Sequence, residues 1–483
     1  MKPSHATDPS AIDLLLKKEF CRRRMLGKST VGAGALTTLF GQDRAEAQSK
    51  GSIERLPLPQ KVKRVIWLTM AGGPSHLELF DPKPKLAELH GQPMPESYTS
   101  GQQLAQLQGQ KLMCLGPLFP FQKVGSQGTE ISSLLPHIGS IIDDICLVRS
   151  MTTDAINHDP AHMFMNTGSQ IAGRPSMGAW VNYGLGSVAE NLPGFVVLVS
   201  TGKGRSPQPI AARQWSSGFL PSRFQGVQLR SQGEAVLYLN NPPGVQASQQ
   251  ALDIAAIERL NREHAKRVQD PEIETRIAQY ELAFEMQTSI PNLMDASDET
   301  QETLDLYGCS PGDGSFASNC LLARRLAQRG VRFIQLYHRD WDHHSLLKEE
   351  LPVRAKEVDQ PSAALIKDLQ RLGLLEETLI VWSGEFGRTP MSQANKGTVG
   401  RDHHNKSMSM WLAGGGIRPG IVHGSTDELG YAASEKICSV HDLHATMLHL
   451  LGIQHDAFTY KFQGLDFKLT GVEGAQVIHE ILS

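Results

Sequence analysis

VRFIQLY (Val331–Tyr337) and TLIVWS (Thr378–Ser383) are the segments that indicate the fold class most directly. Both are short, nearly continuous apolar runs, and each follows an amphipathic segment that stops at a glycine, Gly330 or Gly373. A helix that ends at glycine and leads into a strand that is apolar throughout is typical of a parallel sheet buried on both faces. The two stretches therefore predict an α/β fold, a doubly wound and largely parallel sheet with helices on both faces.

Similar signals extend this pattern along the chain. The segments before the two glycines predict helices at about Ser318–Gln328 and Pro361–Leu372. Further apolar runs predict strands at Val62–Met70, Ile145–Arg149, Phe195–Ser200 and Met408–Ala413. Sites in such sheets form at the carboxyl ends of the strands, so polar residues just after these strands are the first functional candidates.

The first 47 residues have the composition of a twin-arginine signal peptide. Three consecutive arginines at positions 22–24 precede the weakly apolar run Thr30–Phe40, and Ala45-Glu46-Ala47 follows as a small-x-small cleavage site. The apolar run is too short to cross a bilayer. We therefore predict export by the twin-arginine route, to the periplasm or the extracellular space.

The rest of the chain is predicted to be one large domain, residues 62–483, after a linker at residues 48–61. A stretch at about residues 201–300 is expected to be an insertion, since its first part is rich in Gly, Pro, Ser and Gln and its second part is charged and helical. Outside the signal there are five cysteines, and whether Cys309 and Cys320 form a disulfide is left open.

The charge of the chain excludes some classes of partner. The formal net charge is −3 over 483 residues, which leaves no basic surface for nucleic acid. No later apolar run is long enough to span a membrane, because Gly, Pro or charged residues interrupt each one. The nature of the ligand therefore has to be inferred from the site.

Polar clusters lie next to the predicted strands. The loop Gly72-Gly73-Pro74-Ser75-His76 follows the first strand, and its backbone amides could face an anion, although a plain turn has the same composition. The segment Asp340-Trp341-Asp342-His343-His344 follows VRFIQLY and combines two carboxylates with two imidazoles. Because D-x-H or D-x-x-x-H spacing suits a divalent metal such as zinc or manganese, we favour a metal site over a solvated turn.

Two more clusters complete the candidate site. In Ser383-Gly384-Glu385-Phe386-Gly387-Arg388, Glu385 can point into a cleft and Arg388 can clamp an oxyanion, unless the two pair only with each other. In Arg401-Asp402-His403-His404-Asn405, a second adjacent His pair stands beside an Asp. Two such pairs, each next to a strand, indicate one shared metal centre.

These segments resemble the uncharacterised domain-of-unknown-function family 1501. The resemblance is carried by motifs that run from about Val62 to the C-terminus: GGPSHLELFDPKPKL, TGSQIAGRPSMGAWVNYGLG, WDHH, VWSGEFGRTPMSQ, GRDHHN, WLAGGGIRPG, DELGY and HDLHATMLHLLG. That family in turn resembles the alkaline phosphatase and sulfatase superfamily. The resemblance implies a doubly wound α/β fold with a metal centre that cleaves or transfers phosphate or sulfate esters.

The resemblance also implies roles for individual residues. Asp340 and His344 fit the D-x-x-x-H element of the superfamily, and Asp342 is the favoured partner of His344 if the W-D-x-H of the family is the true ligand motif. Glu385 stands where the Asp of a strand-end Asp-His pair belongs, and the late His falls on one of the pair His403-His404. The implied cofactor is a divalent metal, with zinc, manganese or calcium as the candidates.

Three departures separate this chain from the superfamily pattern. Phe386 stands where the paired His belongs, and Ala71-Gly72 stands where an acid should follow the first strand. In the segment His158-Asp159-Pro160-Ala161-His162, His158 replaces the usual Cys or Ser nucleophile. The nucleophile is then a metal-activated water, His158 itself or a serine such as Ser75, unless the two histidines of this segment are further ligands.

Two functions fit these observations. The first is a metal-dependent hydrolase of sulfate or phosphate esters, acting on a small molecule or a polymer such as a sulfated polysaccharide, with Arg388 stabilising the oxyanion. Its expected metal ligands are Asp342, His344, Glu385, His403, His404 and Asp340. The second is a non-catalytic binding or scaffold protein outside the cytoplasm that retains the fold.

Overall fold

The structure is a computed structural model of the 483-residue chain. It describes residues 51–189, 191–200, 210–236, 246–268, 282–283, 286–287, 289–395 and 397–483. The predicted signal, residues 1–47, lies outside the described residues, as do several parts of the predicted insertion at 201–300. Gly51–Ser483 form one unit, and the description below concerns that unit.

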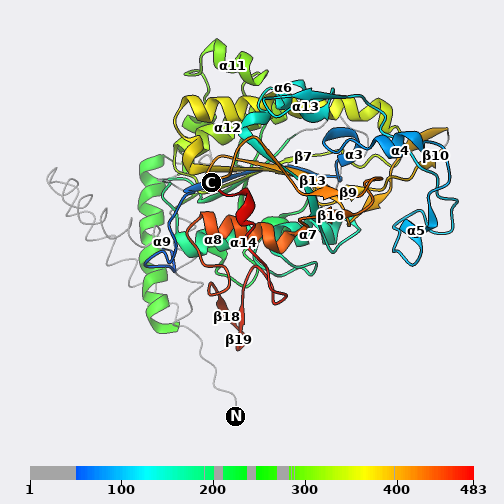
Figure 1. Ribbon diagram of the computed structural model, residues 1–483. Helices are drawn as coiled ribbons and strands as arrows, with labels where there is room; N and C mark the ends of the chain where they lie inside the picture. The colour runs from blue at the N-terminus through cyan, green and yellow to red at the C-terminus, as the bar shows by residue number, and fades with distance from the viewer. Residues whose placement is uncertain are drawn as a thin grey trace, which may run out of the picture. The chain divides into compact units, whose positions relative to one another are not determined.

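A nine-stranded sheet forms the centre of the fold (Figure 1). Its strand order is β14 (Ile421–His423), β4 (Ile145–Thr152), β13 (Met408–Ala413), β8 (Thr378–Ser383), β1 (Arg64–Met70), β7 (Phe333–His338), β5 (Phe195–Val199) and β6 (Val227–Leu229), and β17 (Cys438–Ser439) also pairs with β4. Its neighbouring strands are parallel except where β13 pairs with β8 and β4. The predicted fold class is confirmed, and β6 shows that part of the stretch expected as an insertion extends the sheet.

Helices cover both faces of this sheet. One face carries α6 (Pro136–Gly139), α12 (Phe316–Gln328) and α13 (Leu347–Arg371), and the other carries α7 (His158–Thr167), α8 (Met177–Leu185) and α14 (Val440–Leu450) (Figure 1). Along β1, Ile66, Leu68 and Met70 pack into the first core, whereas Val65 and Trp67 pack into the second. Because side chains alternate along a strand, a strand that is apolar throughout has to be covered on both sides.

Helix α13 begins earlier than the sequence predicts. The predicted strands are present with small shifts at their ends, but the helix expected from Pro361 begins at Leu347 and includes both Pro352 and Pro361. A proline inside a helix costs about 3 kcal/mol, because it removes a hydrogen bond and crowds the preceding turn. The buried apolar face that runs from Leu351 to Leu369 offsets this cost by packing into the core.

Shorter elements surround the central sheet. Two-stranded sheets are β2 (Phe121–Val124) with β3 (Thr129–Ser132), β9 (Gly387–Arg388) with β12 (His403–His404), β10 (Gln393–Asn395) with β11 (Thr398–Gly400), β15 (Ser425–Thr426) with β16 (Ala433–Glu435), and β18 (Tyr460–Phe462) with β19 (Leu465–Phe467). Further helices are α3 (His76–Leu79), α4 (Pro84–Glu88), α5 (Glu96–Thr99), α9 (Ala247–Val268) and α11 (Gln301–Tyr307). Of these elements, β9 and β12 contribute directly to the site.

The cysteines and the hydrophobicity of the helices test two further expectations in the described residues. Its five cysteines are free thiols, so Cys309 and Cys320 are not joined in this structure. Burial raises the pKa of the Cys309 thiol to about 11, which keeps it protonated at neutral pH. No helix in the described ranges combines the length and the apolar character that a membrane crossing needs.

A buried ion pair joins the loop after β1 to the segment before β12. Arg401 donates to both carboxylate oxygens of Glu78 on α3 at 2.6–3.1 Å, and both side chains are fully buried. The guanidinium of Arg401 also donates to the carbonyl oxygens of Thr389 and Gly116. The Ser75 hydroxyl donates to the same Glu78 carboxylate. This pair therefore holds three separate segments beside the candidate site.

Replacing Glu78 with glutamine is expected to lower the free energy of unfolding by about 3–5 kcal/mol, because Arg401 keeps its buried charge and loses its counter-ion. A urea titration followed by circular dichroism measures the loss. Glu88→Gln is the matched control, since Glu88 pairs with Lys85 at the exposed surface and no measurable loss is expected there. Equal stability of Glu78→Gln and the unmutated protein would contradict this account.

Candidate metal centre

The candidate site lies at the carboxyl edge of the sheet, where three adjacent parallel strands end. Gly72 follows β1, Asp342 follows β7 and Glu385 follows β8. His158 begins helix α7, and His403 lies on β12. Because the carboxyl ends of parallel strands meet at one edge, the sheet brings residues together that are far apart in the sequence.

The short ladder between β9 and β12 decides which histidine of the pair reaches the centre. His403 pairs with Arg388 across this ladder, and neighbouring residues on a strand face opposite sides. His403 accordingly points to Asp342, with Nε2 3.2 Å from Oδ1. His404 points the other way, where its Nε2 meets the carbonyl oxygen of Tyr431 and its ring packs on the Tyr431 ring.

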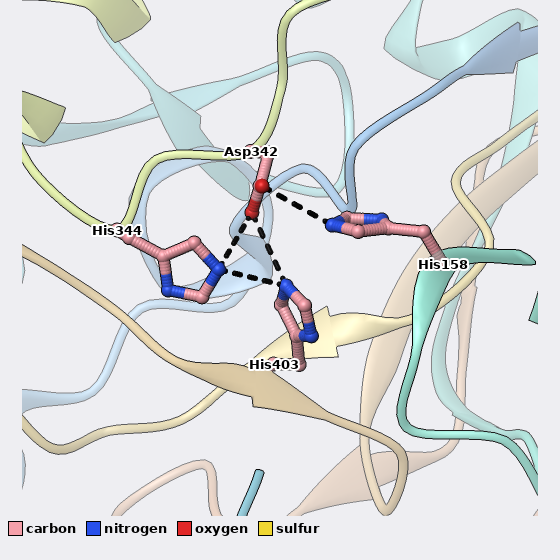
Figure 2. A group of neighbouring side chains, drawn as sticks. All are labelled: His158, Asp342, His344 and His403. Atoms are coloured by element: carbon pink, nitrogen blue, oxygen red, sulfur yellow. Dashed lines mark hydrogen bonds and ion pairs between the residues drawn. The ribbon is translucent and has the colours of Figure 1, made fainter. Parts of the chain in front are cut away.

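Three ligand atoms form a compact triangle at the centre (Figure 2). His344 Nε2 lies 2.8 Å from His403 Nε2, and the two nitrogens lie 3.0 and 3.2 Å from Asp342 Oδ1. His158 Nε2 lies 3.2 Å from the other carboxylate oxygen, Oδ2. Two ligand atoms on one tetrahedral zinc ion are about 3.3 Å apart when each lies about 2.0 Å from the metal. The side chains therefore fit a metal ion, and all four ligand atoms lie within 4.8 Å of one another.

Each of the three imidazoles has an acceptor at Nδ1. These acceptors are the Ile156 carbonyl oxygen for His403 at 3.0 Å, Gln393 Oε1 for His344, and Glu385 Oε1 for His158 at 2.6 Å. A neutral imidazole carries one N–H, so an acceptor at Nδ1 leaves the lone pair on Nε2. Lone pairs of His344 and His403 only 2.8 Å apart repel each other unless a cation or a proton lies between them. The arrangement suits a metal ion that both nitrogens could hold.

The charges around the centre favour ionised Asp342 and neutral His403. Burial alone would raise the pKa of Asp342, but its contacts with the three imidazoles and the charge of Arg388 hold that pKa well below its usual range. Burial lowers the pKa of His403 to about 4, although Asp342 opposes this shift. Burial would also lower the pKa of His158, but its hydrogen bonds to Asp342 and Glu385 outweigh burial and raise that pKa to about 9. A metal competes with that proton, since ligands bind in their deprotonated form.

Glu385 forms a second group with His158 and His162. The Gly72 N–H donates to both Glu385 oxygens, at 3.0 and 3.1 Å. Burial opposes ionisation of Glu385, but His162, His158 and the Gly72 N–H outweigh it and lower its pKa to about 2. The 2.6 Å between Glu385 Oε1 and His158 Nδ1 fits a strong hydrogen bond. We therefore interpret Glu385 as the acceptor that orients His158.

Three residues that the sequence singled out lie outside both groups. The Asp340 carboxylate lies 3.7 Å from Arg354 Nη1. The backbone of Asp340 is in the left-handed region, with a φ of 72°. His404 faces away from the centre, and the Ser75 hydroxyl is bound to Glu78. The expected ligands that the structure brings together are Asp342, His344 and His403, with Glu385 one contact farther out.

The oxyanion role expected of Arg388 does not fit its surroundings. All three guanidinium nitrogens donate inside the protein: Nε to the Gly73 carbonyl at 2.8 Å, Nη1 to the Arg401 carbonyl at 3.0 Å, and Nη2 to Asp342 Oδ1 at 2.6 Å and to the Gly72 carbonyl. The side chain is also almost completely buried. Arg388 therefore positions Asp342, and it does not pair with Glu385 as the alternative expectation had it.

Phe386 occupies the position where the superfamily pattern would place a paired histidine. Its ring packs against His158 and His403, with centroids 4.9 and 4.7 Å apart, and is fully buried. The apolar ring therefore forms a wall behind the two imidazoles.

Two glutamines at the centre were missed by the sequence interpretation. Gln393 accepts from His344 Nδ1, and Gln106 Nε2 lies 3.3 Å from His344 Nε2. A neutral amide belongs to no metal motif, and both residues lie far from His344 in the sequence. The available signal was the density of glutamine in residues 101–111, which carries five in eleven positions.

The family model described as "Protein of unknown function (DUF1501)" matches residues 62–482. The chain belongs to this family. The predicted family is thus confirmed, and none of the curated proteins matches the sequence of this DUF1501 protein.

Several solved structures are similar to this DUF1501 protein. One is the lipoteichoic acid synthase LtaP from Listeria monocytogenes, with 10% identity over 85% of this chain and 78% of that chain and a TM-score of 0.34. Another is the PsFucS1 sulfatase from Pseudoalteromonas sp., with 13% identity over 85% of this chain and 70% of that chain and a TM-score of 0.32. A third is a protein in the alkaline phosphatase superfamily from Vibrio parahaemolyticus, with 9% identity over 86% of this chain and 76% of that chain and a TM-score of 0.33. TM-scores this low assign neither an activity nor a substrate to this chain.

Asp342→Asn is expected to weaken zinc binding by roughly 100-fold or more, because it removes the one anionic ligand of the triangle. Zinc content after dialysis and competition with a chelating dye measure the loss. Asp340→Asn is the matched control and is expected to retain zinc, since its carboxylate lies outside both groups. Zinc retained in Asp342→Asn, or lost equally in both variants, would show that the centre is assigned to the wrong residues.

Proposed function

We propose that this DUF1501 protein is an exported, metal-dependent hydrolase of sulfate or phosphate esters. The observation that carries the proposal is the triangle of Asp342, His344 and His403. Catalytic zinc sites have three protein ligands and keep a position for water or substrate, whereas structural sites are closed by four. The side chains of Asp342 and His344 remain 15% and 20% exposed, so the centre is accessible to a ligand.

The donor set favours zinc or manganese over calcium. Imidazole nitrogens suit zinc, whereas calcium takes six to eight oxygen ligands. When bound, such a cation polarises an ester oxygen and lowers the pKa of a bound water toward about 7. In this proposal Asp342, His344 and His403 hold the cation, and Arg388 keeps Asp342 ionised and in place.

His158 and Glu385 supply the proton transfer in this proposal. Glu385 accepts the Nδ1–H of His158, so Nε2 is the atom that faces the centre. A carboxylate behind an imidazole fixes its orientation and stabilises the imidazolium that forms when Nε2 takes up a proton. Without a cation His158 is protonated, so this step requires that a cation at the centre displace that proton first. His158 Nε2 can then take the proton of the attacking water and deliver it to the leaving oxygen of the ester. Ser75 has no part in this step, because its hydroxyl is bound to Glu78.

The proposed substrate is a sulfate or phosphate ester of a small molecule or a polymer, sulfated polysaccharides included. Export by the twin-arginine route belongs to the proposal and rests on the sequence of residues 17–47. Polymers of this kind lie outside the cell, so the proposed location and the proposed substrate class agree.

A non-catalytic binding or scaffold protein outside the cytoplasm is the second candidate. One observation favours it: the guanidinium of Arg388 is engaged inside the protein and cannot contact a charged substrate. Such a protein would bind the metal and an anion without cleaving an ester.

The zinc- or manganese-loaded protein is expected to release sulfate or phosphate from an aryl ester, because the cation activates both the ester and the water. Absorbance assays with 4-nitrophenyl sulfate and 4-nitrophenyl phosphate measure the release. Chelation is expected to abolish it and metal to restore it, and Asp342→Asn controls for contaminating hydrolases. Metal uptake without turnover on either ester would favour the binding protein.

His158→Gln is expected to lower kcat by about 100-fold or more while zinc stays bound, because the variant cannot carry the proton. Glu385→Gln is expected to cost about 10–100-fold, since it loosens the orientation of His158. Steady-state kinetics and zinc content are measured together, with the exposed His137→Gln as the control. Loss of zinc from His158→Gln would make His158 a fourth ligand and would refute its role as the proton carrier.

A further inference from the structure

The segment Gly101–Lys111, called the glutamine loop below, borders the metal centre. Asp402 Oδ2 accepts hydrogen bonds from the backbone N–H of Gln106 at 2.6 Å and of Leu107 at 3.0 Å. Leu107 is also buried in a small apolar cluster. Because Asp402 precedes His403 in the chain, these bonds hold the glutamine loop beside β12. The loop is held through its backbone and through Leu107, so its position does not depend on the side chain of Gln106.

A series of hydrogen bonds fixes the direction of the Gln106 carboxamide. His344 Nδ1 donates to Gln393 Oε1, which leaves the Gln393 amide to donate to Gln106 Oε1 at 3.0 Å. With its oxygen engaged in this way, Gln106 turns its Nε2 toward the centre, 3.3 Å from His344 Nε2. A carboxamide nitrogen carries two N–H groups and no acceptor. The glutamine loop therefore presents a donor to the centre.

We propose that Gln106 donates this N–H to an oxygen of a tetrahedral oxyanion, phosphate or sulfate, that binds at the centre. The inference rests on the proposed function and assigns to Gln106 the contact that Arg388 cannot make. Gln106 is exposed, whereas Arg388 is buried with its nitrogens engaged. Neutral amides serve as oxyanion donors when they are held in place before the ligand arrives. The bond between Gln393 and Gln106 supplies that orientation.

The relation between Gln106 and His344 explains why the donor has to be neutral. An ammonium or guanidinium 3.3 Å from His344 Nε2 would repel a cation held by the same nitrogen. A carboxamide carries no charge, so it can donate a hydrogen bond beside the cation without competing with it. Gln106 is therefore a catalytic residue in this inference, since it contacts the substrate oxyanion, and Gln393 is the positioning residue behind it.

Calorimetric titration of phosphate and of sulfate into the zinc-loaded protein tests this inference without a turnover assay. Gln106→Leu is expected to weaken binding of the preferred oxyanion by about tenfold or more, the effect of losing one hydrogen bond to a charged group. The zinc content is expected to stay unchanged, because Gln106 is not a ligand. Leucine keeps most of the volume of the side chain, and the backbone bonds to Asp402 remain. The two titrations also show which oxyanion the centre prefers.

Gln108→Leu is the matched control, because Gln108 belongs to the same glutamine loop and its amide bonds to the Leu104 carbonyl. This variant is expected to bind the oxyanion as the unmutated protein does. Equal oxyanion affinity in Gln106→Leu and the unmutated protein would overturn the inference and leave the proposed hydrolase untouched. Failure of the unmutated protein to take up either zinc or manganese would overturn the proposed function, and this inference with it.

Discussion

The carboxylate of Asp342 is the charge on which the rest of the site depends. Three imidazole nitrogens and the buried guanidinium of Arg388 converge on its two oxygens. Arg388 is in turn bound to the carbonyl oxygens of Gly72 and Gly73, so the loop after β1 is tied to the same point. Charge-assisted hydrogen bonds are strong in a protein interior, where the effective dielectric is low. One carboxylate at the end of β7 thus fixes elements that are distant in the sequence.

The central strands were predictable because their environment is uniform. A strand buried on both faces is apolar at most positions, and the runs at β1, β7 and β8 are of this kind. Polar residues at the ends of such strands share one edge, so Asp342 and Glu385 were candidate site residues from their position, together with the residue types around them and the family pattern. The start of α13 was not predictable in the same way. Its prolines argue locally against a helix, and only packing of its buried face on the core outweighs them.

The details of the site depend on pairing, which the sequence does not encode locally. The sequence alone does not show which of His403 and His404 reaches the centre. The register of β12 against β9 decides it, because the two side chains face opposite sides of the ladder. Asp340 and Asp342 both have acceptable spacing to His344, but only Asp342 contacts it. Gln106 reaches His344 through a loop held by Asp402, a contact between residues 296 positions apart. Such contacts follow from tertiary structure, and no spacing rule predicts them.

The balance of charge explains how the centre can suit an anionic ester although Arg388 is engaged. Asp342 and Glu385 are ionised, and protonated His158 and Arg388 neutralise them when no metal is bound. In the proposed metal-bound state a divalent cation would displace at most the proton of His158, so the centre would carry net positive charge. That charge would attract a sulfate or phosphate group, whereas the charge of Arg388 is engaged in holding Asp342. The attraction for the substrate would then come from the metal. His158 and Gln106 would orient the substrate through the proton transfer and the hydrogen bond proposed for them.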